Sequence, residues 1–302
     1  MTGPASGAPR VSVLMSVRDA APYLEASMRG VLAQTFADLE LIVVDDGSAD
    51  GSAAVAESVA DPRVRVLRRP RLGIVAAHNA GLDAVRGELV ARQDADDLLP
   101  PDRLARQVAL LDRRPEVVAC GTDYEMFGAR TGVVRMPRTA AACRARLLFG
   151  TCVAHGTSMI RAAALTGPDA VRYREEYAYA EDYRLFSELA GRGDLVNLPY
   201  VGLRYRWHGR QVSVAAETAQ RRASIAVALA NLRRGGVADV DAAAVERMMW
   251  MDRRGAGAAL DYLLRVAPGL VRTGARAAGR PGALTALQLV RERLNTALRA
   301  AA

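Results

Sequence analysis

Four consecutive residues, Asp94-Ala95-Asp96-Asp97, place three carboxylates close together directly after an apolar stretch. Like charges at this spacing repel one another, and a carboxylate is costly to bury without a partner. Oxygen ligands of this kind suit Mg²⁺ or Mn²⁺, and those ions in turn hold phosphate groups. The cluster therefore predicts a divalent-cation site for a phosphorylated ligand. The alternative is an acidic turn exposed to solvent.

A second acidic pair, Asp45-Asp46, follows the apolar run at residues 39–44, just as the first cluster follows the run at 89–91. Both runs are typical of buried strands. The carboxyl ends of parallel strands meet at one edge of a sheet, where open α/β sheets bind their ligands. We therefore expect the two acidic clusters to face one crevice.

The elements that must position these carboxylates alternate between strands and helices. Apolar runs predict strands at residues 11–17, 39–44, 64–67 and 89–91, with helices between them. This alternation is typical of an α/β fold with a mainly parallel central sheet flanked by helices. Neither GxGxxG nor GxxxxGK[ST] is present, so a nucleotide would have to be held by carboxylates, a metal ion and arginines.

Composition divides the 302 residues into two parts. The net charge is +8, and residues 215–302 hold 14 arginines against seven acidic residues. This stretch has helical patterning, which predicts a helical C-terminal extension at 215–302 after a first domain at 1–214. The three cysteines match no zinc pattern or disulfide framework. No apolar run reaches the roughly 18 residues that span a bilayer, and no signal core begins the chain, so we expect a cytoplasmic protein.

Three separate motifs, in order and at the right spacing, carry a resemblance to a known family. They are the run from Val11 to Leu24, the run from Glu40 to Ser48, and His78-Asn79-Ala-Gly-Leu82 followed by the Asp94–Asp97 cluster. Together they resemble the inverting family 2 glycosyltransferases, which have the GT-A fold. The resemblance implies a metal-dependent transfer of sugar from a nucleotide-sugar, with UDP-sugar favoured, to an acceptor hydroxyl.

The resemblance also implies roles for particular residues. In the acidic motif, Asp96 would bind the Mg²⁺ or Mn²⁺ ion, assisted by Asp94 and by His208 from the segment Tyr205–Ser213. A lone histidine is also compatible with simple packing. Arg92 would pair with Asp94 or reach the donor. The residues implied to bind the nucleotide-sugar are Ser16, Arg18, Asp46, Arg71, Arg92, Asp94 and Arg206.

Glu181-Asp182 begins a stretch whose apolar face predicts a helix to Leu189. Acidic residues in a first turn stabilise a helix, and from the residues alone this is the simpler interpretation. The family resemblance instead matches the pair to an ED motif, with Asp182 as the general base. His155, on the stretch before it, would be structural or line the acceptor.

The basic tail leaves the partners open. It suits an anionic membrane surface, at the inner face of the membrane and with a lipid-linked acceptor, or a helical cap or oligomer contact. Few aromatics accompany its arginines, so we expect no nucleic acid as a partner. The acceptor class, whether glycan, lipid-linked or small molecule, and the oligomeric state stay undetermined. One rival function is a sugar nucleotidyltransferase, but this sequence lacks the glycine-rich loop that such an enzyme usually has. The other is a non-enzymatic basic scaffold or nucleic-acid-binding protein.

Overall fold

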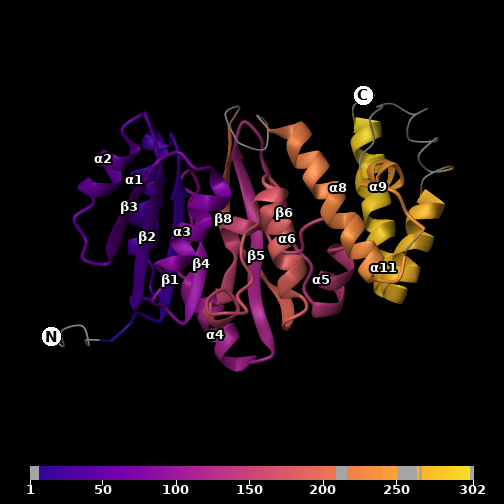
Figure 1. Cartoon of the computed structure of the whole chain (residues 1–302), viewed down its shortest axis with the longest axis horizontal. Helices are drawn as coiled ribbons and strands as arrows, with labels where there is room; N and C mark the ends of the chain where they lie inside the picture. Colours follow the sequence, from indigo (N-terminus) through magenta and orange to yellow (C-terminus); the bar gives the residue numbers. More distant parts are fainter. Residues whose placement is uncertain (1–6, 209–215, 238, 250–263, 265–266, 300–302) are drawn as a thin grey trace.

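Residues 11–92 build the parallel half of an eight-stranded sheet, in the order β3-β2-β1-β4. The computed structural model describes residues 7–208, 216–237, 239–249, 264 and 267–299 (Figure 1). The four predicted strands are present, with the last three one or two residues longer than their apolar runs. Their bounds are β1 (Val11–Val17), β2 (Leu39–Asp46), β3 (Val64–Arg69) and β4 (Leu89–Arg92), with helices α1 (Ala21–Leu32), α2 (Ser52–Ser58) and α3 (Ile74–Asp83) between them.

The other half of the sheet is mixed. A short strand, β7 (Met159–Arg161), pairs antiparallel with β4 on one side and β5 (Val117–Gly128) on the other. The long β8 (Asp194–Trp207) runs parallel to β5, and β6 (Gly132–Val134) pairs with β5 antiparallel. The sheet therefore confirms the α/β class with a mainly parallel centre, and β8 brings its carboxyl end back toward the end of β4.

Alternate residues of each central strand enter opposite core layers, because successive side chains of a strand point to opposite faces. On β1, Leu14 joins the layer that contains α3, whereas Val13 and Met15 join the layer that contains α1 and α2. The helix α4 (Arg103–Arg113) belongs to the α1 layer. The α3 layer also takes α5 (Ala140–Arg146), α6 (Glu181–Leu189) and the short turns η2 (Ala162–Ala164) and η3 (Glu175–Tyr177). A third short turn, η1 (His155–Thr157), contacts β4, β5 and β8.

The C-terminal helices extend the α3 layer at one end of the molecule (Figure 1). They are α8 (Glu217–Arg234), α9 (Ala242–Met249) and α11 (Ala267–Arg299). Buried Asn231 of α8 donates hydrogen bonds to Leu147 O and Ser187 Oγ, and α11 packs against α5. The predicted extension is thus helical, while the division at residue 214 stays a prediction.

A break in the last helix lies slightly before the predicted position. Pro281-Gly282 predicts the interruption, but the backbone leaves helical geometry at Ala278 and Gly279, where Gly279 has a φ of 58°. A proline disturbs the turn that precedes it, which explains the offset. The apolar spacing of residues 260–266 also predicts an amphipathic segment, and this stretch lies outside the described residues except for Leu264. Among the described helices, none has the length and apolar character needed to cross a membrane.

A buried glutamate fastens the end of the sheet opposite the acidic clusters. Glu40, 2 % exposed, accepts hydrogen bonds from Ser12 Oγ, Arg65 and Arg86 at 2.6–3.1 Å. Burial opposes the ionisation of Glu40, but these hydrogen bonds outweigh it and hold the pKa of the carboxyl below its ordinary value. The network joins β1 and β2 to the turn that leads into β4.

Glu40→Gln is expected to lower the free energy of unfolding at pH 7 by about 2 kcal/mol, because hydrogen bonds to a charged acceptor are replaced by weaker ones. Since the folded-state pKa is depressed, the stabilisation is complete above the unfolded pKa and is lost as pH falls through the folded pKa. The gap between wild type and variant should therefore begin to narrow below about pH 4.5. Urea unfolding from pH 7 to 3 checks this, with the exposed Glu57→Gln as control; a gap as wide at pH 3 as at pH 7 contradicts it.

Candidate active site

The acidic loop after β4 is held by hydrogen bonds to its backbone groups. Gln93 Nε2 donates to Asp94 O and Asp97 O, each at 3.1 Å, and Ser27 Oγ donates to Asp94 O at 2.8 Å. The next residue, Leu98, exchanges two backbone hydrogen bonds with Arg204 of β8. Helix α1, β8 and Gln93 just after β4 therefore fix the loop together through its backbone.

Each carboxylate of this loop has a different partner. Asp94 Oδ1 pairs with Arg92 at 2.7 Å, and Asp96 Oδ2 lies 3.0 Å from His208 Nε2. Asp97 Oδ1 accepts the Arg206 N–H at 2.7 Å, while its Oδ2 is buried without a partner among the described residues. Burial raises the pKa of Asp96 and brings the pKa of Asp97 to about 9, and the charge of Asp94 adds to both.

This donor set fits a divalent cation. The loop concentrates hard oxygen atoms beside the imidazole of His208, and the raised pKa values of Asp96 and Asp97 mean that a positive charge would relieve the repulsion among the carboxylates. The structure places His208 against Asp96, and Asp94 lies two residues before Asp96 in the same loop, where it pairs with Arg92. The assignment of the three residues to one metal ion stays a prediction. Arg206 lies beside them: its Nε donates to Asp96 O, and its guanidinium stacks 4.6 Å from the ring centre of Tyr23.

The predicted nucleotide-binding residues spread along the carboxyl edge of the parallel strands. Ser16, at the end of β1, places its Oγ 2.6 Å from His78 Nδ1. Arg18 is half-exposed and lies 3.8 Å from the carboxylate of its neighbour Asp19. These two residues lie between the acidic loop and the end of β2.

The side chain of Asp46 is hydrogen-bonded to the backbone of the loop after β3. Its carboxylate accepts the N–H groups of Leu72 and Gly73 at 2.8–3.3 Å, so it shapes the segment that carries the exposed Arg71. Its neighbour Asp45 has a buried Oδ1 with no partner among the described residues. The assignments of Asp46 and Arg71 to the nucleoside pocket stay predictions, and Asp45 joins them as a candidate that the sequence did not distinguish.

The other pair of acids begins α6, as predicted. Asp182 Oδ1 accepts the N–H of Tyr183 at 2.7 Å. Burial raises the pKa of Asp182 to about 6, with the charge of Asp94 contributing, and burial together with the charge of Asp182 raises the pKa of Glu181 to about 7. A carboxylate whose pKa lies near the working pH is suited to accept a proton in catalysis.

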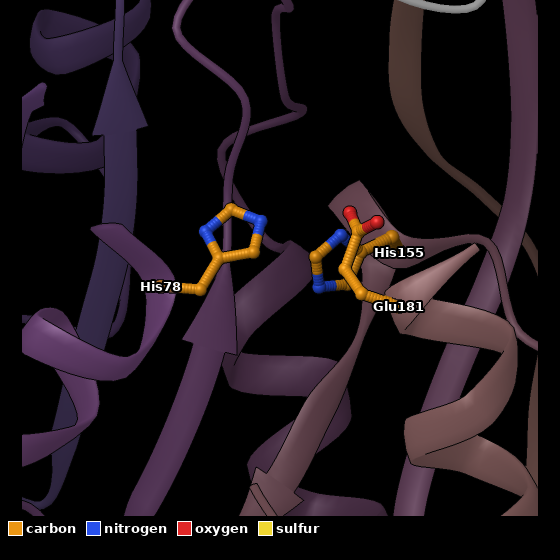
Figure 2. A group of neighbouring side chains, drawn as sticks. All are labelled: His78, His155 and Glu181. Atoms are coloured by element: carbon orange, nitrogen blue, oxygen red, sulfur yellow. The ribbon is translucent and has the colours of Figure 1, made fainter. Parts of the chain in front are cut away.

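A group of polar side chains lies beside both acidic groups. Arg92, which pairs with Asp94, also directs its Nε toward His155 Nε2 at 3.4 Å, and that nitrogen lies 2.7 Å from Tyr173 Oη. The ring of His78 lies 5.2 Å from that of His155 (Figure 2). Gly156 fits closely here, since a Cβ at this position would lie 2.6 Å from Asp94 Oδ2. Sequence reasoning placed neither His78 nor Tyr173 in the site, although His78 belongs to one of the motifs.

Comparison with known proteins identifies the class. The family model "Glycosyl transferase family 2" matches residues 12–165, about half of the chain, and the chain belongs to this family. An uncharacterized glycosyltransferase of Haemophilus influenzae is 29% identical over 220 residues, 68% of each protein. The putative glycosyltransferase EpsE of Bacillus subtilis is 32% identical over 163 residues, which are 52% of this chain and only 58% of EpsE.

Solved structures agree on the fold. The S. aureus TarS 1-349 complex with UDP-GlcNAc aligns with a TM-score of 0.63 at 16% identity, covering 96% of this chain and 91% of that one. The mannosyltransferase PcManGT of Pyrobaculum calidifontis, in complex with GDP-Man and Mn²⁺, aligns with a TM-score of 0.52 at 21% identity, covering 93% and 88%. These likenesses confirm the GT-A fold. Family membership makes the protein a glycosyltransferase, so the nucleotidyltransferase and scaffold alternatives are set aside.

Proposed function

We propose that this chain is a metal-dependent, inverting transferase that moves a sugar from a nucleotide-sugar, with UDP-sugar favoured, to an acceptor hydroxyl. The observation that carries the proposal is the proximity of the Asp94–Asp97 loop to the Glu181-Asp182 pair, with Arg92 paired to Asp94 and His155 close to Glu181. One carboxylate group has the chemistry to hold a diphosphate through a cation, and the other has the chemistry to accept a proton. Among the structural neighbours, TarS holds UDP-GlcNAc and PcManGT holds GDP-Man with Mn²⁺.

The donor side would be held by Asp94, Asp96 and His208 through Mg²⁺ or Mn²⁺. When bound, such an ion neutralises negative charge on the diphosphate leaving group. The chain adds its own positive charge there: Arg206 lies over the acidic loop and Arg18 at the end of β1. Ser16 and Asp46 line the same edge toward the nucleoside.

Asp182 would act as the general base. Its carboxylate takes the proton of the acceptor hydroxyl while that oxygen bonds to the anomeric carbon. The bond from that carbon to the diphosphate oxygen breaks on the opposite face, so the configuration inverts and no covalent enzyme intermediate is required. Glu181, its buried neighbour, helps to keep the pKa of the pair near neutrality because their charges repel.

The acceptor and the membrane contact remain predictions. On α11, exposed Leu284 and Leu287 lie near Arg280 and Arg291 along the helix, which is the chemistry of a helix that lies on an anionic bilayer. This arrangement supports a lipid-linked acceptor at the cytoplasmic face of a membrane.

Calorimetric titration of UDP and GDP, followed by their sugars, tests the donor site. We expect binding in the presence of Mn²⁺ that falls by about 100-fold or more with EDTA or in Asp96→Asn, because the diphosphate then loses its counter-charge, worth several kcal/mol. Asp112→Asn, an acid at the far end of α4, should bind like wild type. If the folded protein binds no nucleotide at all, the proposed function is wrong.

A further inference from the structure

A second cluster of ligand-type side chains lies beside the acidic loop. His78 of α3, His155 of η1 and Glu181 of α6 each offer one atom, and these atoms lie within 4.8 Å of one another. Figure 2 shows the Glu181 carboxylate beside the His155 ring, with His78 facing them from its own helix. Three elements far apart in sequence therefore converge on one point.

Two of these side chains are buried with an unpartnered ligand atom. His78 is 1 % exposed, and its Nε2 has no hydrogen-bond partner among the described residues. Glu181 is 5 % exposed, and its Oε2 also has no hydrogen-bond partner among the described residues. Buried polar atoms nearly always have partners, and leaving one without costs about 1–3 kcal/mol. Two such atoms aimed into one cluster indicate a ligand that satisfies both.

The surrounding residues orient the imidazoles as a metal site requires. Ser16 Oγ lies 2.6 Å from His78 Nδ1, and when Nδ1 carries the proton and donates it to this hydroxyl, Nε2 keeps the lone pair. His155 Nε2 lies 2.7 Å from Tyr173 Oη and 3.4 Å from Arg92 Nε, so metal binding through Nδ1 requires Nε2 to carry the proton and donate it to Tyr173 Oη. Metal-binding histidines usually have their second nitrogen hydrogen-bonded in this way. Burial, together with the positive charge of Arg92, holds the pKa of both histidines well below the ordinary value, so both rings are neutral.

We propose that His78, His155 and Glu181 form a second metal site, for a transition-metal ion of the Zn²⁺ class, separate from the acidic loop. Two imidazoles and one carboxylate favour Zn²⁺ or Co²⁺ over Mg²⁺ or Mn²⁺. Bonds of about 2.0–2.1 Å set tetrahedral ligands roughly 3.3 Å apart, so the side chains must close by at most about 1.5 Å.

The local charge accommodates a dication. Arg92 is the positive group near the cluster, and the carboxylates of Asp94, Glu181 and Asp182 outweigh it. An ion bound to Glu181 would lie beside Asp182, so zinc is expected to inhibit transfer. That consequence rests on the proposed function, whereas metal binding itself does not.

Cobalt titration of the untagged full-length His208→Asn variant isolates this site. The chain has three histidines, so the only imidazoles left are those of His78 and His155. We expect one equivalent of Co²⁺ with the visible absorption of a four-coordinate ion, displaced by Zn²⁺ and not by excess Mg²⁺. Adding His78→Gln or Glu181→Gln should weaken binding by about 100-fold or more, and Ser16→Ala by about tenfold.

Thermal melts and near-UV circular dichroism establish that each variant is folded. The proposal is overturned if His208→Asn alone abolishes the cobalt spectrum, since the metal then sits only at the acidic loop. It is also overturned if folded His78→Gln and Glu181→Gln bind Co²⁺ as tightly as their parent. Because the readout is a spectrum, a failed sugar transfer leaves this test intact, and the nucleotide titration tests the transferase independently.

Discussion

Replacing Asp182 by asparagine is expected to lower kcat by about 10²- to 10⁴-fold, with the affinity for the donor nucleotide nearly unchanged. The variant loses the group that takes the acceptor proton. Its amide oxygen can still accept the N–H of Tyr183, so α6 keeps its first turn. Release of nucleoside diphosphate, with the donor that the titration identifies, measures the turnover.

A matched variant lies two turns further along the same helix. Glu188→Gln removes a carboxylate that pairs with Arg184 and Arg174, away from the acidic loop, and should retain turnover within a few-fold. In wild type, kcat/KM should fall about tenfold per pH unit below pH 6, because burial raises the pKa of Asp182 to about 6 and only the ionised form accepts a proton. If Asp182→Asn turns over like Glu188→Gln, another group is the base.

Local signals explain how much of the fold was predictable. The apolar runs of β1 and β2, Pro22 near the start of α1, and the spacing of Leu185 and Leu189 on α6 all act within a few residues. The two apolar runs and the α6 spacing place their elements to within about two residues. These segments carry both acidic motifs, which is why their convergence on one edge of the sheet could be inferred from chain order alone.

Long-range pairing explains what the sequence did not reveal. β5 and β8 are separated by more than sixty residues, and their register contains irregularities that no local pattern records. The antiparallel insertion of β7 between β4 and β5 depends on partners from both sides. The strand pairing in the mixed half of the sheet could therefore be learned only from the structure.

The same difference between local and long-range signals separates the site residues that were predicted from those that were missed. Asp94, Asp96 and Asp182 lie in short motifs, whereas Tyr173 comes from an irregular loop and reaches the site only through His155. His78 lies on the buried face of α3, and packing on that face is a sufficient reason for a histidine at this position. From the sequence, Arg92 could either pair with Asp94 or reach toward the donor. The structure contains the ion pair with Asp94.

Arg92 is the side chain on which both halves of the site depend. It is 2 % exposed, and its guanidinium donates to Leu14 O at 2.7 Å, to Gln93 O at 3.0 Å and to Asp94 Oδ1 at 2.7 Å. Its Nε faces His155. A methionine at this position would fill similar volume but would provide none of these hydrogen bonds.

Arg92→Met is therefore expected to lower the free energy of unfolding by about 3 kcal/mol, because it leaves a carboxylate and buried carbonyls without their donor. For a chain of this size the melting temperature should fall by roughly 6–12 °C. Differential scanning calorimetry measures the shift, and donor affinity should fall with it since Asp94 loses its fixed orientation. Arg92→Lys should recover only part of the loss, because an ammonium group cannot reproduce the fork of a guanidinium.

The control is an arginine with equally short contacts in a different environment. Arg68 pairs with Glu57 through two hydrogen bonds of 2.6 Å, but its side chain is 59% exposed. Exposed pairs of this kind contribute about 0–1 kcal/mol, so Arg68→Met should shift the melting temperature by no more than a few degrees. Equal shifts in the two variants would mean that burial adds nothing to the Arg92 network, and that Asp94 and His155 are held in place by the backbone alone.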